Sequence, residues 1–203
     1  MPACKNGRKT LEKYEIGGIE EMKATGIVRR IDDLGRIVVP KEIRRTLRIR
    51  EGDPLEIFTD REGEIILKKY SPIGELSKFA EEYAESLAQT TGYLVVITDC
   101  DHVVAASGSG RKDFDGKPIS GQLEEAIGSR KNFLAARDET GFVKITLDDA
   151  GEYGQQAVST IICEGDAIGS VILCTKSEKG KMGEVESKLA AAAAGFLGRQ
   201  MEQ

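Results

Sequence analysis

Apolar and polar residues alternate over short stretches between residues 22 and 70, which is the pattern of a small β-rich unit. The stretch "ATGIVRRI" predicts a strand, "DDLG" a turn and "RIVV" a second strand, after which Pro40 opens a helix that we expect to end at Gly52. Two further strands, 55–59 and 64–69, flank the turn "DREG" and predict a hairpin. A unit this small buries little apolar surface by itself, so we expect it to share one core with a second copy.

Two later segments have a helical pattern. Residues 71–90 begin with Ser71 as a candidate N-cap and Pro72 at the first helical position. Their apolar residues then recur in steps of three and four: Ile73, Leu76, Ala80, Tyr83 and Leu87. A second helix, 181–202, has the same spacing at Met182, Val185, Leu189, Ala192 and Phe196. The spacing is typical of a coiled-coil or bundle seam, and equally of an amphipathic helix packed on its own sheet.

Between these helices the pattern returns to short strands. "GYLVVITD" and "HVVAASG" predict two strands joined by a tight turn at Asp99–Asp101, and residues 156–176 predict a hairpin of two apolar strands. We expect a helix over 119–129 and an exposed strand at "GFVKITL". Strands with flanking helices predict an α+β domain. The predicted organisation is an extension at 1–21, a β-rich unit at 22–70, a linking helix at 71–90 and an α+β domain at 91–203.

The first residues of the chain, 1–21, show no sustained period. The codons of Gly17 and Gly18 can contain a purine-rich run at the distance of a ribosome-binding site from Met22. We therefore expect Met22 to be the true start and residues 1–21 to be a disordered leader. The sequence has no apolar run of the roughly 20 residues that cross a bilayer and no signal-peptide pattern, which predicts a cytoplasmic protein without a membrane partner.

Charge is distributed unevenly along the chain, whose net charge is −5. Residues 22–70 hold twelve Lys and Arg against nine Asp and Glu, whereas residues 71–203 hold thirteen against twenty-one. Such a split predicts that the first part meets a polyanion.

Seven basic residues lie close together within the predicted strands and helix. At 100° per residue, four of them share one face of the helix that Pro40 opens, with Ile43 and Leu47 opposite. Phosphate is a natural partner for such a stripe, because each neutralised phosphate releases counterions. An ordinary solvated helix face is the alternative. The candidate nucleic-acid contacts are Arg29, Arg30, Arg36, Lys41, Arg44, Arg45 and Arg48.

The segment "MKATGIVRRIDDLGRIVVPKEIRRTLRIREGDPLEIF", residues 22–58, resembles the AbrB family of bacterial transcription regulators, most densely in "TGIVR", "LGRIVVP" and "EIRRTL". The resemblance implies a swapped-hairpin β-barrel formed by an intertwined dimer. It also implies binding to double-stranded, A/T-rich DNA that is recognised by its shape. Arg29, Arg36, Arg44 and Arg45 match the arginines with which that family contacts DNA.

Residues 22–203 as a whole resemble the sporulation regulators of this family, in which a GAF domain follows the DNA-binding domain. The resemblance implies a sequence-tolerant activator or repressor of forespore genes. It also implies a homotetramer in which helices 71–90 and 181–202 join two dimers. The alternative in the same class is a swapped-hairpin antitoxin, which would usually end in a disordered tail, whereas residues 71–203 are patterned as a globular domain.

The expected GAF domain has one candidate ligand loop, "SGSGRKDFDGKPISG" at residues 107–121. Its glycine-rich start offers backbone N–H groups to an anion, and two basic side chains add charge. A plain surface loop is the alternative, in which case the domain serves only to clamp two DNA-binding dimers together. The predicted partners are therefore DNA, further copies of the chain and an effector of unidentified chemistry. The candidate loop residues are Ser107, Ser109, Arg111 and Lys112.

The cysteines are widely spaced and the chain has a single histidine, so no zinc site of familiar spacing is predicted. Some GAF proteins reduce methionine sulfoxide with cysteines, which makes a thiol reductase the enzymatic alternative. A catalytic thiol needs a lowered pKa, which acidic neighbours and apolar strands disfavour here. We expect no enzyme, no metal and no cofactor. The residues concerned are Cys4, Cys100, Cys163, Cys174 and His102, the last of which we expect in a turn.

Overall fold

The computed structural model describes residues 27–149, 153–176 and 182–202. The chain divides into two compact units, Met1–Gly52 and Asp53–Gln203. The predicted leader and Cys4 lie outside the described residues, and our domain boundaries stay predictions. Among the described residues, no helix combines the length and the apolar character needed to pass through a membrane.

The first unit contains a tight turn and a short helix. The turn Asp32–Gly35 is closed by a hydrogen bond from Gly35 N to Asp32 O (3.0 Å), and α1 (Lys41–Thr46) follows Pro40, which is its N-cap. No strand forms in residues 27–39. The strand predicted from "RIVV" is therefore wrong for the single chain, as is the described part, residues 27–31, of the strand predicted from "ATGIVRRI". A strand needs a neighbour for its backbone hydrogen bonds, and no described segment supplies one.

The helix α1 is shorter than we predicted. The chain leaves it through a Schellman motif, in which Ile49 N donates to Arg44 O (2.7 Å) and Arg48 N donates to Arg45 O (3.3 Å). Arg48 occupies the left-handed position of this motif with a φ of 51°. Arg48 therefore lies outside α1. The prediction that the helix extends to Gly52 is wrong, and so is the prediction that Arg48 belongs to its basic face.

The second unit begins with the predicted hairpin, which is confirmed. Strands β1 (Leu55–Thr59) and β2 (Ile65–Lys69) pair antiparallel, with Ile57 opposite Leu67. The carboxylate of Asp60 holds the turn, because its Oδ1 accepts hydrogen bonds from the backbone N–H groups of Glu62 (3.0 Å) and Glu64 (2.8 Å).

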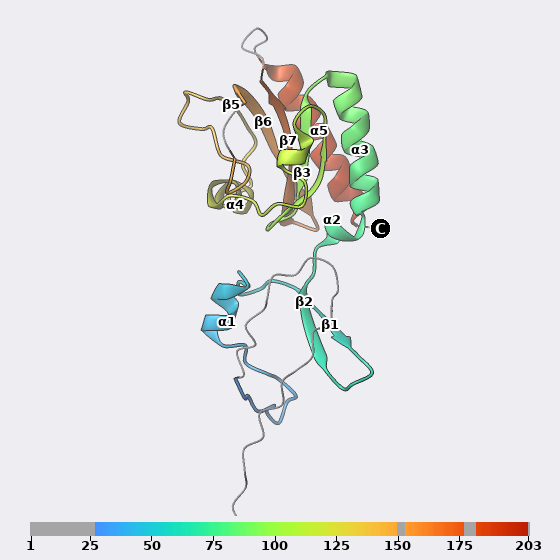
Figure 1. Ribbon diagram of the computed structural model, residues 1–203, viewed down its shortest axis with the longest axis vertical. Helices are drawn as coiled ribbons and strands as arrows, with labels where there is room; N and C mark the ends of the chain where they lie inside the picture. Colours follow the sequence, from blue (N-terminus) through green and yellow to red (C-terminus); the bar gives the residue numbers. More distant parts are fainter. Residues whose placement is uncertain (1–26, 150–152, 177–181, 203) are drawn as a thin grey trace, which may run out of the picture. The chain divides into compact units, whose positions relative to one another are not determined.

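An antiparallel sheet with the strand order β4-β3-β7-β6-β5 forms the centre of the second unit. Helices α3 and α5 cover one face of this sheet and α4 the other, as Figure 1 shows. The predicted α+β class, the β3–β4 turn and the β6–β7 hairpin are confirmed. The elements are α2 (Pro72–Glu75), α3 (Ser77–Thr91), β3 (Leu94–Thr98), β4 (Val103–Ser107), the 3-10 helix η1 (Arg111–Asp113), α4 (Gly121–Gly128), β5 (Phe133–Ala136), β6 (Gln155–Cys163), β7 (Asp166–Thr175) and α5 (Glu184–Gln200).

The helix predicted over residues 71–90 is divided in two at Leu76. Its start is as predicted, because Pro72 is the first helical residue and the Ser71 hydroxyl accepts a hydrogen bond from Gly74 N (3.1 Å). The short helix α2 places Ile73 in the core with no exposed surface. The break therefore lets one large side chain enter the core before α3 begins.

The segment "GFVKITL" is not the strand that we predicted. With the amide of Gln156 oriented so that both of its ends find partners, Nε2 donates to Val143 O (3.1 Å) and Oε1 accepts from Val143 N (2.6 Å). Ile145 N donates to the carboxylate of Asp149 (3.1 Å). Side chains thus form the hydrogen bonds to the backbone of Val143 and Ile145 that a neighbouring strand would otherwise form. The strand at the edge of the sheet beside β6 is instead β5, which the sequence analysis did not predict.

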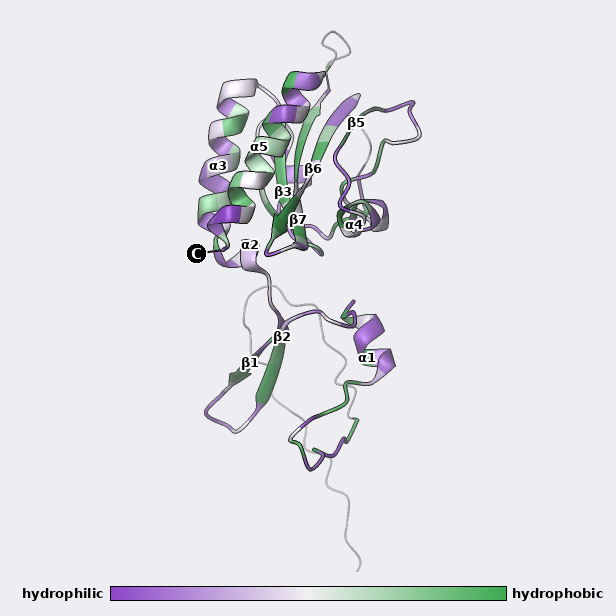
Figure 2. Ribbon diagram, turned by 180° about the vertical axis from the view of Figure 1, so that it is seen from behind, coloured by the Kyte–Doolittle hydropathy of each residue, from purple (hydrophilic) through white to green (hydrophobic). Residues whose placement is uncertain are grey.

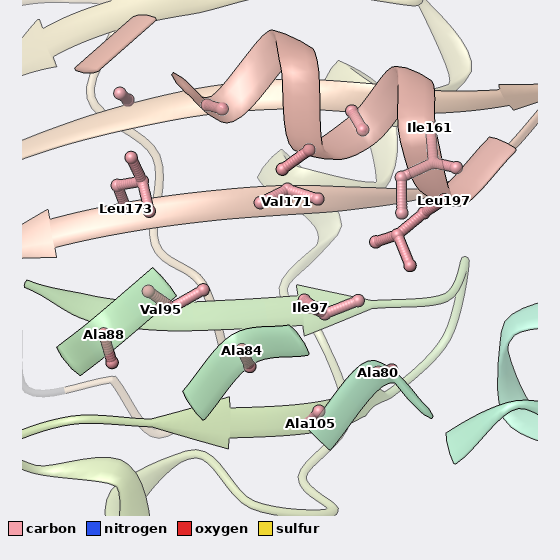
Figure 3. Close-up of a cluster of buried hydrophobic side chains, with 14 of the residues drawn as sticks. Ala80, Ala84, Ala88, Val95, Ile97, Ala105, Ile161, Val171, Leu173 and Leu197 are labelled. Atoms are coloured by element: carbon pink, nitrogen blue, oxygen red, sulfur yellow. The ribbon is translucent and has the colours of Figure 1, made fainter. Parts of the chain in front are cut away.

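Small residues of α3 and α5 face the sheet (Figure 3). The sheet-facing residues of α3 are Ala80, Ala84 and Ala88, and those of α5 are Ala190, Ala193, Ala194 and Leu197. Figure 2 shows the strands β3, β6 and β7 that they cover as hydrophobic. Several larger residues of the predicted seams remain outside this core. Leu76, Val185 and Phe196 are 36%, 66% and 37% exposed.

Candidate nucleic-acid interface

All seven candidate DNA contacts lie in the first unit. The side chains of Arg29, Arg30 and Arg36 are exposed on either side of the Asp32–Gly35 turn. On α1, the spacing of Lys41, Arg44 and Arg45 places them on one side of the helix. Arg48 is exposed beyond the helix end. Basic residues are thus exposed on both sides of the turn, on α1 and just beyond its end, although α1 itself carries three of them and not the predicted four.

Arg44 differs from its neighbours because its side chain is half-buried. Its Nε is buried and has no hydrogen-bond partner within the described residues. A buried donor left without a partner costs about 1–3 kcal/mol. An acceptor from a second copy or from a bound polyanion would remove this cost.

The first unit has no hydrophobic core of its own among its described residues. None of the residues of α1 is buried, and Val28, Leu34 and Val38 are 91%, 69% and 73% exposed. The hairpin of the second unit has the same character, because Ile57 and Ile65 are 66% and 60% exposed. Large apolar side chains that remain in water within one chain mark a surface that another chain covers.

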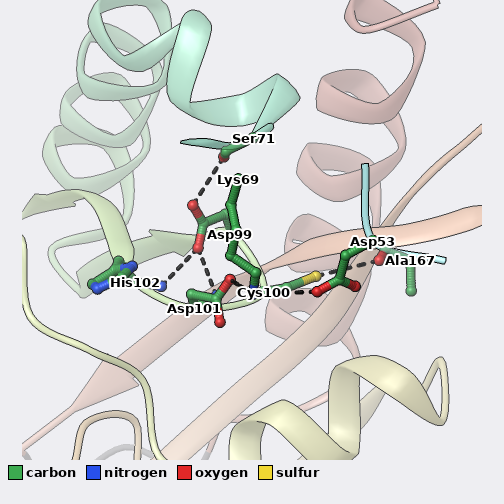
Figure 4. A network of polar contacts seen from close by, with 8 residues as sticks. All are labelled: Asp53, Lys69, Ser71, Asp99, Cys100, Asp101, His102 and Ala167. Carbon is green, nitrogen blue, oxygen red and sulfur yellow. Dashed lines mark hydrogen bonds and ion pairs between the residues drawn. The ribbon is translucent and has the colours of Figure 1, made fainter. Parts of the chain in front are cut away.

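A cluster of polar contacts, which we call the polar clasp, fixes the end of β2 to the β3–β4 turn (Figure 4). Lys69 Nζ lies 2.6 Å from Asp101 Oδ2 and 3.4 Å from Asp53 Oδ2. The Ser71 hydroxyl donates to Asp99 Oδ2 (2.8 Å). The side chains of Lys69 and Asp101 are only 26% and 16% exposed, so water screens their attraction less than it screens a surface pair. The clasp therefore ties the hairpin firmly to the sheet domain.

The β3–β4 turn itself is held by Asp99, whose Oδ1 accepts hydrogen bonds from the backbone N–H groups of Asp101 (2.7 Å) and His102 (2.6 Å). His102 closes this turn, because its backbone O accepts a hydrogen bond from Asp99 N (3.0 Å), but it forms an isolated β-bridge with Pro118 and is not the turn residue that we predicted. Within the described residues, no group of three or more potential ligands is arranged to hold a metal ion.

The candidate ligand loop of the α+β domain is folded against the sheet. Ser107 ends β4, Ser109 follows, and Arg111 and Lys112 lie in η1. Two of the four glycines of the loop, both at its start, have packing reasons. A Cβ at Gly108 would come within 2.7 Å of Tyr93 O, and a Cβ at Gly110 within 2.6 Å of the Tyr153 hydroxyl. An anion cradle is therefore not needed to explain these glycines.

Apolar side chains fill the sheet face beneath this loop. The rings of Phe114 and Tyr153 are 5.5 Å apart, and both side chains are almost fully buried. They pack with the buried residues Ile119, Leu123, Ile127 and Ile145. A face filled in this way favours a structural role for the domain.

The thiols of the described residues have no catalytic features. Burial and the carboxylate of Asp149 raise the pKa of Cys174, and burial with nearby carboxylates, chiefly that of Glu164, raises the pKa of Cys163. The Cys100 thiol donates a hydrogen bond to Ala167 O (3.4 Å). The described cysteines are free of disulfides. Raised thiol pKa values oppose the thiolate that a reductase needs.

Comparison with protein families matches both parts of the chain. Residues 28–75 match the model "Antidote-toxin recognition MazE, bacterial antitoxin". Residues 75–202 match the model "Stage V sporulation protein T C-terminal, transcription factor". An N-terminal domain of the AbrB and MazE type followed by an α+β domain of this kind defines a class of bacterial transcription regulators.

Known proteins identify the family within that class. The chain is 54% identical over 182 residues to stage V sporulation protein T of Bacillus subtilis (strain 168), a match that covers 90% of this chain and all of the relative. It is 51% identical over 75 residues to the transition state regulatory protein AbrB of the same organism, which covers 37% of this chain and 77% of AbrB. The chain belongs to the stage V sporulation protein T family, and the predicted resemblance is confirmed.

Solved structures are similar in fold to the α+β domain, which the resemblance predicts to be a GAF domain. A type II free methionine-R-sulfoxide reductase from Thermoplasma acidophilum is similar with a TM-score of 0.50 and 11% identity, covering 64% of this chain and 94% of the reductase. Residues 122 to 287 of a methyl-accepting chemotaxis protein are similar with a TM-score of 0.52 and 18% identity, covering 62% and 88%. At these identities the likeness shows the fold alone.

Proposed function

We propose that this chain regulates sporulation genes by binding double-stranded DNA through the basic surface of its first unit, in the cytoplasm of the developing forespore. The observation that carries the proposal is the exposure of six basic residues, Arg29, Arg30, Arg36, Lys41, Arg45 and Arg48, around one turn and one short helix, with the half-buried Arg44 beside them. The resemblance to the AbrB family implies A/T-rich, deformable sites without a strict consensus.

The DNA-binding form is an intertwined dimer. Residues 27–39 lack a strand partner within the described chain, and their apolar side chains are exposed. A second copy supplies both the partner strands and the apolar cover, which is the arrangement of a swapped hairpin. Two copies also double the number of arginines that face the DNA.

Two such dimers join into a tetramer through the outer surface of α3 and α5. Three aromatic rings meet there, with Phe196 lying 5.9 Å from Phe79 and 5.3 Å from Tyr83 between ring centroids. Leu76 and Val185, from the same predicted seams, are also exposed. An aromatic cluster with apolar neighbours has the composition of an interface core.

The GAF-like domain acts mainly as a clamp that holds two DNA-binding dimers together and raises their effective concentration on DNA. The filled sheet face and the packing reasons for Gly108 and Gly110 support this role. Effector sensing through Arg111 and Lys112 is the second candidate. It predicts a metabolite that raises the thermal midpoint of the protein and loses this effect in Arg111→Ala/Lys112→Ala.

An antitoxin and a thiol reductase both fit this chain less well. An antitoxin tail is usually disordered until it wraps the toxin, whereas most of residues 76–202 fold into helices and a sheet. A thiol reductase needs a thiol with a lowered pKa, whereas the pKa values of Cys163 and Cys174 are raised.

The proposal is tested by fluorescence anisotropy with an A/T-rich duplex over a series of salt concentrations. Wild-type protein should bind less tightly as salt rises, and Arg44→Ala/Arg45→Ala should bind weakly with a shallower slope, because fewer phosphates are neutralised. Arg111→Ala/Lys112→Ala removes the same charge from the other domain and should bind like wild type. Equal binding by all three proteins would contradict the proposal.

A further inference from the structure

The carboxylate of Asp32 makes three hydrogen bonds at the turn before α1. Its Oδ1 accepts from the backbone N–H groups of Leu34 (3.0 Å) and Arg36 (2.8 Å). Its Oδ2 accepts from the side-chain Nε of Arg36 (2.8 Å). One acidic residue therefore holds both the main chain of the turn and the guanidinium of a candidate DNA contact. The sequence pattern did not mark Asp32 as part of the site.

The pair leaves the outer end of the arginine available. The side chain of Arg36 is 69% exposed and that of Asp32 is 36% exposed. An arginine has one N–H on Nε and four on its two Nη atoms. Because Asp32 takes the Nε donor, both Nη groups remain for a bidentate contact to a phosphate or a guanine edge.

The lowered pKa of Asp32 favours the ionised carboxylate at neutral pH. Hydrogen bonds from the backbone and side chain of Arg36, in that order, lower the pKa of Asp32, so it stays ionised when DNA binds. An exposed ion pair adds little to folding stability. Its larger effect is on orientation, because an arginine that is already held in place loses less conformational freedom when it binds.

We propose that Asp32 is a positioning residue for DNA binding, which orients the guanidinium of Arg36 through its Nε. This role rests on the proposed function. It has a consequence that charge alone does not predict. Removing a negative charge from a DNA-binding surface should strengthen binding by simple electrostatics, whereas loss of Asp32 should weaken it.

Asp32→Asn separates the two tasks of the carboxylate. The amide oxygen of asparagine can still accept the two backbone hydrogen bonds of the turn, but its NH₂ group cannot accept the Nε–H of Arg36. Asp33→Asn is the matched control, because it removes the same charge from the adjacent position in the same turn. Full-length Asp32→Asn should bind an A/T-rich duplex about threefold to tenfold more weakly than wild type, as expected when one long side chain loses its pre-ordering. Asp33→Asn should bind as tightly as wild type or more tightly.

A double-mutant cycle distinguishes orientation of Arg36 from a general effect on the fold. In an Arg36→Ala background, Asp32→Asn should cause no further loss of affinity. Arg36→Lys keeps the charge and leaves Asp32 in place, but lysine lacks both the Nε–H that Asp32 accepts and the two Nη groups that would contact DNA. It should weaken binding at least as much as Asp32→Asn.

Two results would overturn the role of Asp32 while leaving the proposed function intact. One is wild-type affinity in both Asp32→Asn and Arg36→Lys, and the other is an equal loss from Asp32→Asn with and without Arg36. If wild-type protein shows no salt-dependent DNA binding, the proposed function and the role of Asp32 fail together.

Discussion

Gly198 allows α5 to lie directly on the sheet. A Cβ at this position would overlap with the carbonyl oxygen of Ile162 in β6. We expect Gly198→Ala to lower the free energy of unfolding by about 1–3 kcal/mol, because helix and strand must move apart. Gly195→Ala is the control on the same helix, since nothing lies within 4 Å of its added Cβ. It should stabilise the protein by up to about 1 kcal/mol. Urea denaturation measures both, and equal stability of the two variants would contradict the close packing of α5.

A second residue-scale prediction concerns alkaline pH. Burial, with the carboxylate of Asp149, raises the pKa of Cys174 above its ordinary value of 9.0. Above pH 9 the thiol therefore ionises in the unfolded chain while it stays protonated in the folded one. The unfolded state then binds fewer protons, so the free energy of unfolding falls as pH rises, by at most about 1.4 kcal/mol per pH unit. Below pH 9 this group contributes no pH dependence.

Urea denaturation of wild type and Cys174→Ala at pH 8, 9 and 10 checks this prediction. Other alkaline groups, such as Tyr83, whose pKa burial also raises, act equally in both proteins. The decline above pH 9 should therefore be less steep in Cys174→Ala. If the free energy of unfolding falls equally steeply with pH in both proteins, ionisation of Cys174 does not cause the decline.

At the scale of elements, the end of α1 offers a test of local geometry and charge together. Arg48 has a φ of 51°, where glycine is at ease and other residues are strained. Arg48→Gly and Arg48→Ala both remove the charge, but only glycine fits the left-handed position. We expect the glycine variant to be about 1 kcal/mol more stable in urea denaturation. The two variants should bind DNA equally weakly, and tight binding by either would remove Arg48 from the interface.

Much of the sheet domain could be predicted from the sequence, because its elements are held by local patterns. Alternation and turn residues located the hairpin around Asp60, the β3–β4 turn and the β6–β7 hairpin. The failures have a common physical cause. At Val143, side chains replace the strand neighbour that alternation implied, and at Arg48 the chain adopts a left-handed conformation without the glycine that usually signals a helix end.

The candidate site was predictable only in part. The clustering of basic residues could be read directly, because charge is a property of each residue. The role of Asp32 could not, since it depends on a hydrogen bond that forms only when the turn brings Arg36 back beside it. In the sequence, Asp32 was predicted only as part of the turn "DDLG".

At the scale of the whole molecule, the strands that the sequence predicts in residues 27–39 are missing from the single chain. Their partners are not in the described part of the same chain, so a periodic pattern that is correct for an assembly is wrong for a monomer. The apolar residues that such strands would bury are exposed here, Val28 most of all at 91%. The proposed dimer would cover these residues and supply the missing strand partners.

The proposed tetramer can be separated from the dimer. Phe196→Ser removes the residue that contacts both Phe79 and Tyr83 on the outer surface of α3 and α5. We expect the variant to remain folded and to sediment as a dimer at concentrations where wild type is a tetramer. Lys188→Ala, an exposed change on the same helix, should leave the tetramer intact. A tetrameric Phe196→Ser variant would place the dimer–dimer interface elsewhere.

Native mass spectrometry of the full-length protein with a short A/T-rich duplex tests most directly whether paired first units form the DNA-binding surface. We expect complexes with even numbers of chains, because two copies are needed to complete each DNA-binding unit. Arg44→Ala/Arg45→Ala should keep the oligomers but lose the duplex. A complex of one chain with one duplex, or oligomers that never carry DNA, would contradict this claim.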